Sequence, residues 1–297
     1  MDTYFNILAS YAYLAISKNF CDLVTKSAAE RKINLMIDSG AFTAYNAKKT
    51  TDYINLDSYC NFLSKYENNC EKYVMLDVIL NEKASKQNYE TMVKRGFKPM
   101  FVVTTKDKDF SYIQDTLKIN KNICVAGGVT EPAKWCCARY QNVFYKTGEQ
   151  AQIHGLGFVK YPLMFQVPIK SVDSSSWTTG LRFGGSMFWN NGLKHLSWQD
   201  VLKKGAKIPM FAKQTLENLK ISPEIYSQEK YHRGNNQIGL FLTIYAFVRF
   251  QRYTKQCGKQ LFLAVSNKIQ LERILYVYEN YNDLDYEKYL KYLNKIK

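Results

Sequence analysis

The sequence has no apolar run long enough to cross a bilayer. Its longest run, at residues 238–250, has about the length of one helix and carries Arg249. The first ten residues lack the basic start of a secretory signal, and the 7 cysteines are scattered rather than spaced as a disulfide framework. We therefore expect a protein of the cytoplasm, with reduced thiols and no membrane anchor.

Metal and cofactor motifs are also missing. There is no CxxC or HxxxH pair, and Cys136 and Cys137 are adjacent, so a structural zinc site is not expected. The sequence has neither a P-loop nor a GxGxxG turn, and no motif in it indicates a redox cofactor. The expected chemistry therefore uses side chains alone, without a metal or a cofactor.

Positive charge, in contrast, is abundant and uneven. The chain has 41 Lys and Arg against 26 Asp and Glu, and residues 201–297 alone hold 17 against 8. Together with 23 Tyr and 17 Phe, such a basic surface suits phosphates and exposed bases, which predicts nucleic acid as a partner. The alternative is a lysine- and tyrosine-rich composition inherited from an AT-rich genome.

Short apolar runs alternate with segments of helical periodicity, which predicts a parallel sheet of buried strands. An eighth strand, at 181–189 or at 260–266, would complete a (β/α)8 TIM-like barrel, and an open doubly wound sheet is the alternative. The barrel would occupy residues 1–200, and residues 201–297 would form a basic, aromatic, helical appendage packed on it. The first seven strands are expected at residues 4–9, 33–37, 73–76, 100–103, 123–126, 151–154 and 169–172.

Polar or glycine motifs directly follow several of these strands. Because all the strands of a barrel run the same way, these motifs would meet at one end, where barrel enzymes hold their catalytic residues. Carboxylates are costly to desolvate, so their place at several strand ends argues for function, although each could instead cap a helix. The motifs are DSG at 38–40, Asp77, GG at 127–128, HGLG at 154–157 and Asp173.

The segment VDSSSW places Asp173 at the end of an apolar run, followed by three serines and Trp177. We expect the serine hydroxyls to keep the carboxylate ionised, as a nucleophile requires. Trp177 would shield the site or stack on a displaced base. The alternative is a helix-capping aspartate beside a core tryptophan.

These motifs, in this order along residues 36–177, resemble the tRNA-guanine transglycosylase superfamily. The matching stretches are DSGAF, MLDV, AGG, HGLG and VDSSSW. The first and last of them, and the small size, are most similar to the phage-type DNA-guanine transglycosylases. The resemblance implies a pentosyltransferase with queuosine-related chemistry, acting in the host cytoplasm. It would exchange guanine in nucleic acid, DNA rather than tRNA, for a free 7-deazaguanine base.

By position, the resemblance makes Asp173 the nucleophile that attacks C1′ of the guanosine, and Asp38 the general acid and base. Asp77 would read the Watson–Crick edge of the base, and the target base would have to leave its stack first. The further base contacts that the resemblance implies are Gly127, Gly128, His154, Gly155 and Phe42. Ser39, Trp177 and Thr104 are also expected to contact the substrate. The expected contacts to the nucleic acid backbone are Arg182, Lys230, Arg233 and Arg249.

Two features depart from the family pattern. Thr104 stands where the family has a glutamine, and the zinc cluster near the C-terminus is replaced by a basic, aromatic segment, 190–297. This replacement favours DNA but leaves tRNA open. Two further alternatives remain, namely a hydrolytic glycosidase of the same fold and a basic nucleic-acid-binding protein on a barrel that has lost its activity.

Overall fold

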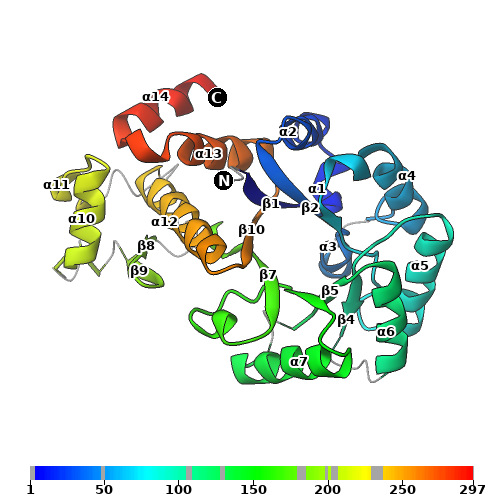
Figure 1. Cartoon of the computed structure of the whole chain (residues 1–297). Helices are drawn as coiled ribbons and strands as arrows, with labels where there is room; N and C mark the ends of the chain where they lie inside the picture. Colours follow the sequence, from blue (N-terminus) through cyan, green and yellow to red (C-terminus); the bar gives the residue numbers. More distant parts are fainter. Residues whose placement is uncertain are drawn as a thin grey trace. The chain divides into compact units, whose positions relative to one another are not determined.

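The chain divides into two compact units. The first unit is Met1–Ser174 with Cys257–Lys268, and the second is Ser175–Gln256 with Ile269–Lys297. The structure is a computed structural model, drawn as a ribbon in Figure 1. It describes residues 4–47, 51–104, 109–127, 131–178, 185–197, 200–201, 207–228 and 237–296.

The first unit contains an 8-stranded sheet in which every pair of neighbouring strands is parallel. The sheet curls, and an isolated parallel bridge between Val74 and Met100 joins the strands at its two ends. This mixed α/β fold is compatible with a TIM-like barrel. The strands, in their order across the sheet, are β3 (Lys72–Tyr73), β2 (Ile33–Asp38), β1 (Phe5–Ser10), β10 (Gln260–Val265), β7 (Ile169–Ser174), β6 (Gln152–Gly155), β5 (Asn122–Val125) and β4 (Phe101–Val103).

The eighth strand of the sheet is β10, the second of the two predicted candidates. It pairs with β1 on one side and β7 on the other, so it must be apolar on both faces. The other candidate contains β8 (Gly185–Trp189), which pairs antiparallel with β9 (Leu193–Ser197) instead. The predicted boundary lies at residue 200, whereas the second compact unit begins at Ser175 and β10, a strand from the C-terminal third, belongs to the first unit.

Helices lie outside the curled sheet of the first unit (Figure 1). The side chains of Asn55, Asn81 and Asp109 cap three of them by accepting a hydrogen bond from a backbone N–H of the first turn. Each of these helices buries one apolar face, as Tyr59, Cys60 and Leu63 do. The helices are α1 (Tyr11–Leu14), α2 (Lys18–Ala29), α3 (Ala41–Asn46), α4 (Leu56–Tyr66), α5 (Glu82–Lys94), α6 (Phe110–Ile119) and α7 (Ala133–Lys146), with short 3-10 turns η1 (Glu67–Asn69) and η2 (Leu163–Phe165).

Polar side chains pair across the strands near the amino ends of the sheet. Asn34 Nδ2 donates to Asn6 Oδ1 at 2.9 Å, and Lys72 Nζ donates to Gln260 Oε1 at 3.0 Å. Side chains two residues apart on a strand share a face, so Asp38 lies on the same face of β2 as Asn34. As the last residue of β2, Asp38 lies at the carboxyl edge of the sheet. The paired polar groups lie at the opposite edge.

The second unit is built around α12 (Gln237–Gln256). Phe241 contacts Tyr289 with 4.5 Å between ring centroids, and Phe250 stacks on Trp189 at 4.8 Å. No helix within the described ranges is long and apolar enough to span a membrane. Besides β8 and β9, the unit contains η3 (Ser176–Thr178), α10 (Met210–Asn218), α11 (Pro223–Tyr226), η5 (Tyr281–Asp283), α14 (Tyr286–Ile296) and, from its second residue on, α13 (Lys268–Glu279).

Candidate active site

Three aspartates converge at the carboxyl edge of the curled sheet. Asp38 is the last residue of β2, Asp173 is the next to last residue of β7, and Asp77 lies four residues beyond the end of β3. Their charges interact: Asp173 raises and His154 lowers the pKa of Asp38, and Asp38 raises the pKa of Asp77. The structure therefore brings together the three carboxylates that the sequence singles out.

Asp38 is held by the turn that follows its strand. The backbone N–H of Gly40 donates to Asp38 Oδ2 at 3.0 Å. Burial raises the pKa of Asp38 above the usual value, while the nearby Ser10 hydroxyl and the Gly40 N–H act in the opposite direction. A carboxyl with a raised pKa retains its proton at higher pH, which suits a group that must donate one.

Asp77 is half-buried beside Ser39. Ser39 Oγ lies 3.5 Å from Asp77 Oδ1, and Ser39 itself is fully buried. Burial, and after it the charge of Asp38, raise the pKa of Asp77 from 3.8 to about 6. Above that pH the carboxylate is an acceptor for hydrogen bonds from a ligand.

Asp173 receives two hydrogen bonds on one oxygen. Gly157 N–H donates to Oδ1 at 2.8 Å, and His154 Nε2 lies 3.2 Å from the same atom. The other nitrogen of His154, Nδ1, lies 2.8 Å from Ser171 Oγ. Both donors bind the ionised carboxylate better than the neutral acid. The expectation that the three serines after Asp173 supply these donors is not met in the described structure.

Two glycines, one following β5 and one ending β6, allow close packing against neighbouring side chains. Gly127 has φ +106°, and a Cβ there would lie 2.5 Å from Arg139 Nη1, which in turn donates to the Ala126 carbonyl. A Cβ on Gly155 would lie 2.9 Å from the Tyr140 hydroxyl oxygen. These contacts explain the two glycines structurally, and their predicted contact with a base stays a prediction. Gly128 lies outside the described residues.

The remaining predicted base contacts differ in exposure. Phe42, on α3, is 66% exposed, so a face of its ring is open to a planar ligand. Trp177, in η3 of the second unit, is 1% exposed, which leaves no ring face for stacking on a base. His154 is fully buried, and its ring nitrogens bind Asp173 and Ser171. Thr104 directly follows β4 and is half-buried.

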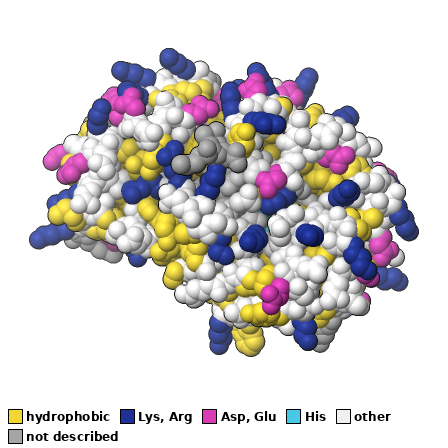
Figure 2. All heavy atoms as spheres, viewed as in Figure 1, with side chains coloured by type: hydrophobic (Ala, Val, Ile, Leu, Met, Phe, Trp, Pro, Cys, Tyr) yellow, Lys and Arg dark blue, Asp and Glu magenta, His cyan; other side chains and the backbone are white. Residues whose placement is uncertain are grey.

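One of the predicted backbone contacts can be located. Arg249 lies on α12, with its Cζ 5.9 Å from the ring centroid of Tyr245. The Cζ of Arg252, on the same helix, lies 3.8 Å from the ring centroid of Tyr281. Neither guanidinium forms an ion pair within the described part of the second unit. Arg182, Lys230 and Arg233 lie outside the described residues. Figure 2 shows Lys and Arg side chains spread over the visible face, with Asp and Glu among them.

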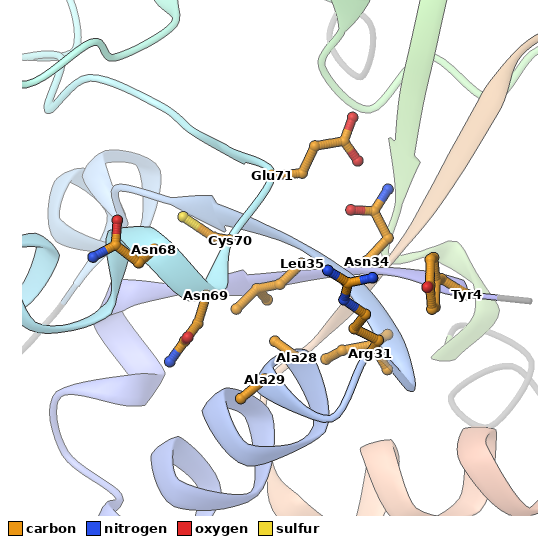
Figure 3. A pocket seen from close by; sticks show the side chains of 11 residues that line it. Tyr4, Ala28, Ala29, Arg31, Asn34, Leu35, Asn68, Asn69, Cys70 and Glu71 are labelled. Carbon is orange, nitrogen blue, oxygen red and sulfur yellow. The ribbon is translucent and has the colours of Figure 1, made fainter. Parts of the chain in front are cut away.

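Two cavities of the first unit lie away from the carboxylates. One, of about 420 Å³, lies near the amino ends of β1 and β2, where Figure 3 shows Tyr4, Arg31, Asn34 and Glu71 around it. The other, of about 620 Å³, lies between α2 and α4. Neither contains a residue that the sequence singles out, so they give no support to the predicted site.

Several residues of the site have no role in the sequence-based prediction, although Gly157 lies in its HGLG motif. Ser171 contacts His154, Gly157 contacts Asp173, and Ser10 pairs with Asp38 in the register of β1 and β2. Two of them had a usable signal. Ser171 is two residues before Asp173 and so shares its face of the strand, and Ser10 ends the strand that neighbours Asp38.

The arrangement can perform acid–base and nucleophilic chemistry. It combines carboxyls with a raised pKa, at Asp38 and Asp77, with Asp173, whose Oδ1 accepts a hydrogen bond from the Gly157 N–H. No group of three metal-binding side chains occurs among the described residues. The fold and the site define an α/β protein with a carboxylate-rich site at the carboxyl edge of a curled parallel sheet. Compared with models of protein families and with curated protein sequences, the chain matches none.

Proposed function

We propose that this protein exchanges guanine in nucleic acid, DNA in preference to tRNA, for a 7-deazaguanine derivative. The observation that carries the proposal is the pairing of Asp38, whose pKa is raised by burial, with Asp173, whose Oδ1 accepts two hydrogen bonds. The order of motifs along residues 36–177, which resembles the guanine transglycosylases, supplies the substrate class. Within the proposal, the curled sheet is a complete (β/α)8 barrel.

The reaction has two displacements at one sugar carbon. In the first, an oxygen of Asp173 forms a bond to C1′ while the bond from C1′ to N9 of guanine breaks, and Asp38 gives its proton to the leaving base. In the second, N9 of the incoming base attacks C1′ and the aspartyl ester breaks, while Asp38 takes the N9 proton. Retaining glycosidases use the same logic of two carboxyl groups on one anomeric carbon.

The base would lie between Phe42 and the glycine turns. The exposed ring of Phe42 supports stacking on one face of the base. An ionised Asp77 would accept hydrogen bonds from N1–H and the exocyclic amine of guanine, and its pKa of about 6 leaves it mostly ionised near neutral pH. Thr104 and the backbone at Gly127 and Gly128 would complete the pocket.

The excess of positive charge supports a polyanionic substrate. The chain has 41 basic against 26 acidic side chains, and Arg249 and Arg252 have no acidic partner among the described residues. Guanidinium groups without such a partner are available to bind phosphates. All 7 cysteines are free, which agrees with a reducing compartment such as the cytoplasm.

The test measures the fate of labelled guanine in double-stranded DNA and in tRNA. We expect label release from DNA only when a free 7-deazaguanine base is added. Release of guanine without added base would support a hydrolytic glycosidase. Preferential release from tRNA would show that tRNA is the substrate. Binding without release would support a binding protein.

A second measurement isolates the nucleophile. With the 7-deazaguanine base withheld, a denaturing gel should retain a covalent complex of wild-type protein and DNA. The complex should be missing in Asp173→Ala. A complex that persists in this variant would rule out Asp173 and direct attention to Asp38.

A further inference from the structure

A continuous hydrogen-bonded chain links Ser171, His154 and Asp173. Ser171 Oγ lies 2.8 Å from His154 Nδ1, and His154 Nε2 lies 3.2 Å from Asp173 Oδ1. Ser171 and Asp173 lie two apart on β7, and His154 pairs with Ser171 in the register of β6 and β7. His154 is fully buried and Ser171 is 3% exposed, so water cannot replace either partner.

An ionised Asp173 would fix the position of the imidazole proton in this chain. An ionised carboxylate only accepts hydrogen bonds, so the nitrogen that faces Asp173, Nε2, must carry the proton. In the neutral ring Nδ1 is then an acceptor, and the Ser171 hydroxyl is the donor that fits it. Ser171 therefore selects the tautomer that donates to Asp173.

The two oxygens of Asp173 are held differently. Gly157 N–H donates to Oδ1, the atom that His154 also contacts, and no described residue donates to Oδ2. Building on the proposed function, we propose that His154 and Ser171 are positioning residues that hold Oδ1 and leave Oδ2 to bond to C1′. This role differs from the contact with one face of the base that position 154 would have by resemblance.

The arrangement affects the two displacements differently. In the first, a lone pair of Oδ2 forms the bond to C1′, and the electrons of the C1′–N9 bond leave with guanine. In the second, the C1′–Oδ2 bond breaks and its electrons return to Asp173, whose charge is shared with Oδ1. Hydrogen bonds to a charged acceptor are stronger than those to an ester, so the donors on Oδ1 stabilise this departure. Loss of His154 should therefore slow the second displacement in particular.

The first arm of the test needs no nucleic acid. Nitrogen NMR of histidine-labelled protein, with the His154 signal assigned by its loss in His154→Gln, reports where the ring proton lies. We expect a neutral ring with the proton on Nε2, and a mixture of tautomers in Ser171→Ala. A proton on Nδ1, a charged ring, or no response to Ser171→Ala would overturn the proposal.

The second arm follows the covalent complex after 7-deazaguanine base is added. In His154→Leu we expect the complex to resolve about tenfold more slowly, with the KM for DNA within about twofold of wild type. His154→Gln should restore most of the rate, because its amide nitrogen can donate to Oδ1 from about the same place. A rescue of this kind is not expected from a purely structural residue.

Cys124→Ala is the matched control. Cys124 is fully buried on β5 and pairs with His154 in register, so its truncation disturbs the same layer without removing a donor to Asp173. If it slows resolution as much as His154→Leu, the effect is packing and the proposal fails. If wild type forms no complex, the proposed function and the role of Oδ2 both fail, whereas the NMR arm still decides the proton position.

Discussion

The backbone N–H of Gly40 donates to Asp38 Oδ2 at 3.0 Å, so the turn that ends β2 also orients the proposed acid and base. Gly40 has φ +84°, a conformation that side chains rarely adopt. A Cβ at this position would lie 2.8 Å from Cβ of Ala12. The geometry of the carboxyl therefore depends on a position where only glycine fits.

Gly40→Ala is expected to lower both stability and activity. The left-handed backbone and the contact with Ala12 together should cost about 1–3 kcal/mol of the free energy of unfolding, measured in urea. Gly96→Ala is the control, since Gly96 has φ +91° and a Cβ there would meet nothing within 4 Å. Base exchange should fall only in the Gly40 variant. An equal fall of activity in both variants would show that the effect of Gly40→Ala does not act through Asp38.

Asp38→Asn should retain nucleic acid binding and lose turnover by roughly two to four orders of magnitude. The amide cannot give a proton to the leaving base, although it keeps the size of the carboxyl and an oxygen for the Gly40 N–H. Binding is measured by fluorescence anisotropy with labelled DNA, and turnover by guanine release. Near-native turnover would show that another group transfers the proton.

Most of the strands could be predicted from the sequence, because they contain short apolar runs bounded by polar or glycine residues. The eighth strand could not be chosen by pattern, since 181–189 and 260–266 both contain apolar and aromatic residues that favour strands. The choice depends on long-range pairing of β10 with β1 and β7, which no local pattern records. The difference between the predicted boundary and the compact units has the same cause.

The places of the aspartates at strand ends could be predicted, but the hydrogen bonds that hold them could not. The position of a residue at a strand end follows from the pattern of apolar residues, whereas its hydrogen bonds depend on neighbours from other strands. Asp173 is held by His154 and Gly157, not by the serines beside it in sequence. Trp177 is likewise adjacent in sequence, but its burial at 1% exposure reflects packing that no motif encodes.

Asp77→Asn should change how stability depends on pH. Because the pKa of Asp77 is raised to about 6 from 3.8, the folded protein holds this proton more tightly than the unfolded chain. The resulting stabilisation of the folded protein is complete below the ordinary pKa of 3.8. It is lost as pH rises through the folded-state pKa of about 6. Relative to wild type, the variant should therefore gain stability between about pH 4 and pH 7, by up to about 1.4 kcal/mol per pKa unit.

Urea unfolding of both proteins across this pH range measures the difference. The contributions of the other titrating groups largely cancel in the comparison, apart from that of Asp38, whose charge raises the pKa of Asp77. Asp52→Asn, at an exposed position, is the control for loss of one negative charge. A difference between Asp77→Asn and wild type that stays constant with pH would contradict the burial of this carboxyl.

Replacing Arg249 and Arg252 together by glutamine should weaken nucleic acid binding and reduce the dependence of binding on salt. Each guanidinium packs on tyrosine rings of the second unit and lacks an ion-pair partner among the described residues there. A phosphate bound by an arginine releases counterions, so each lost contact should lower the slope of log K against log salt by about 1. Replacement of both by lysine should keep the slope, because the charge remains, and Lys94→Gln should leave binding unchanged. A slope that does not change in the double glutamine variant would place the nucleic acid elsewhere.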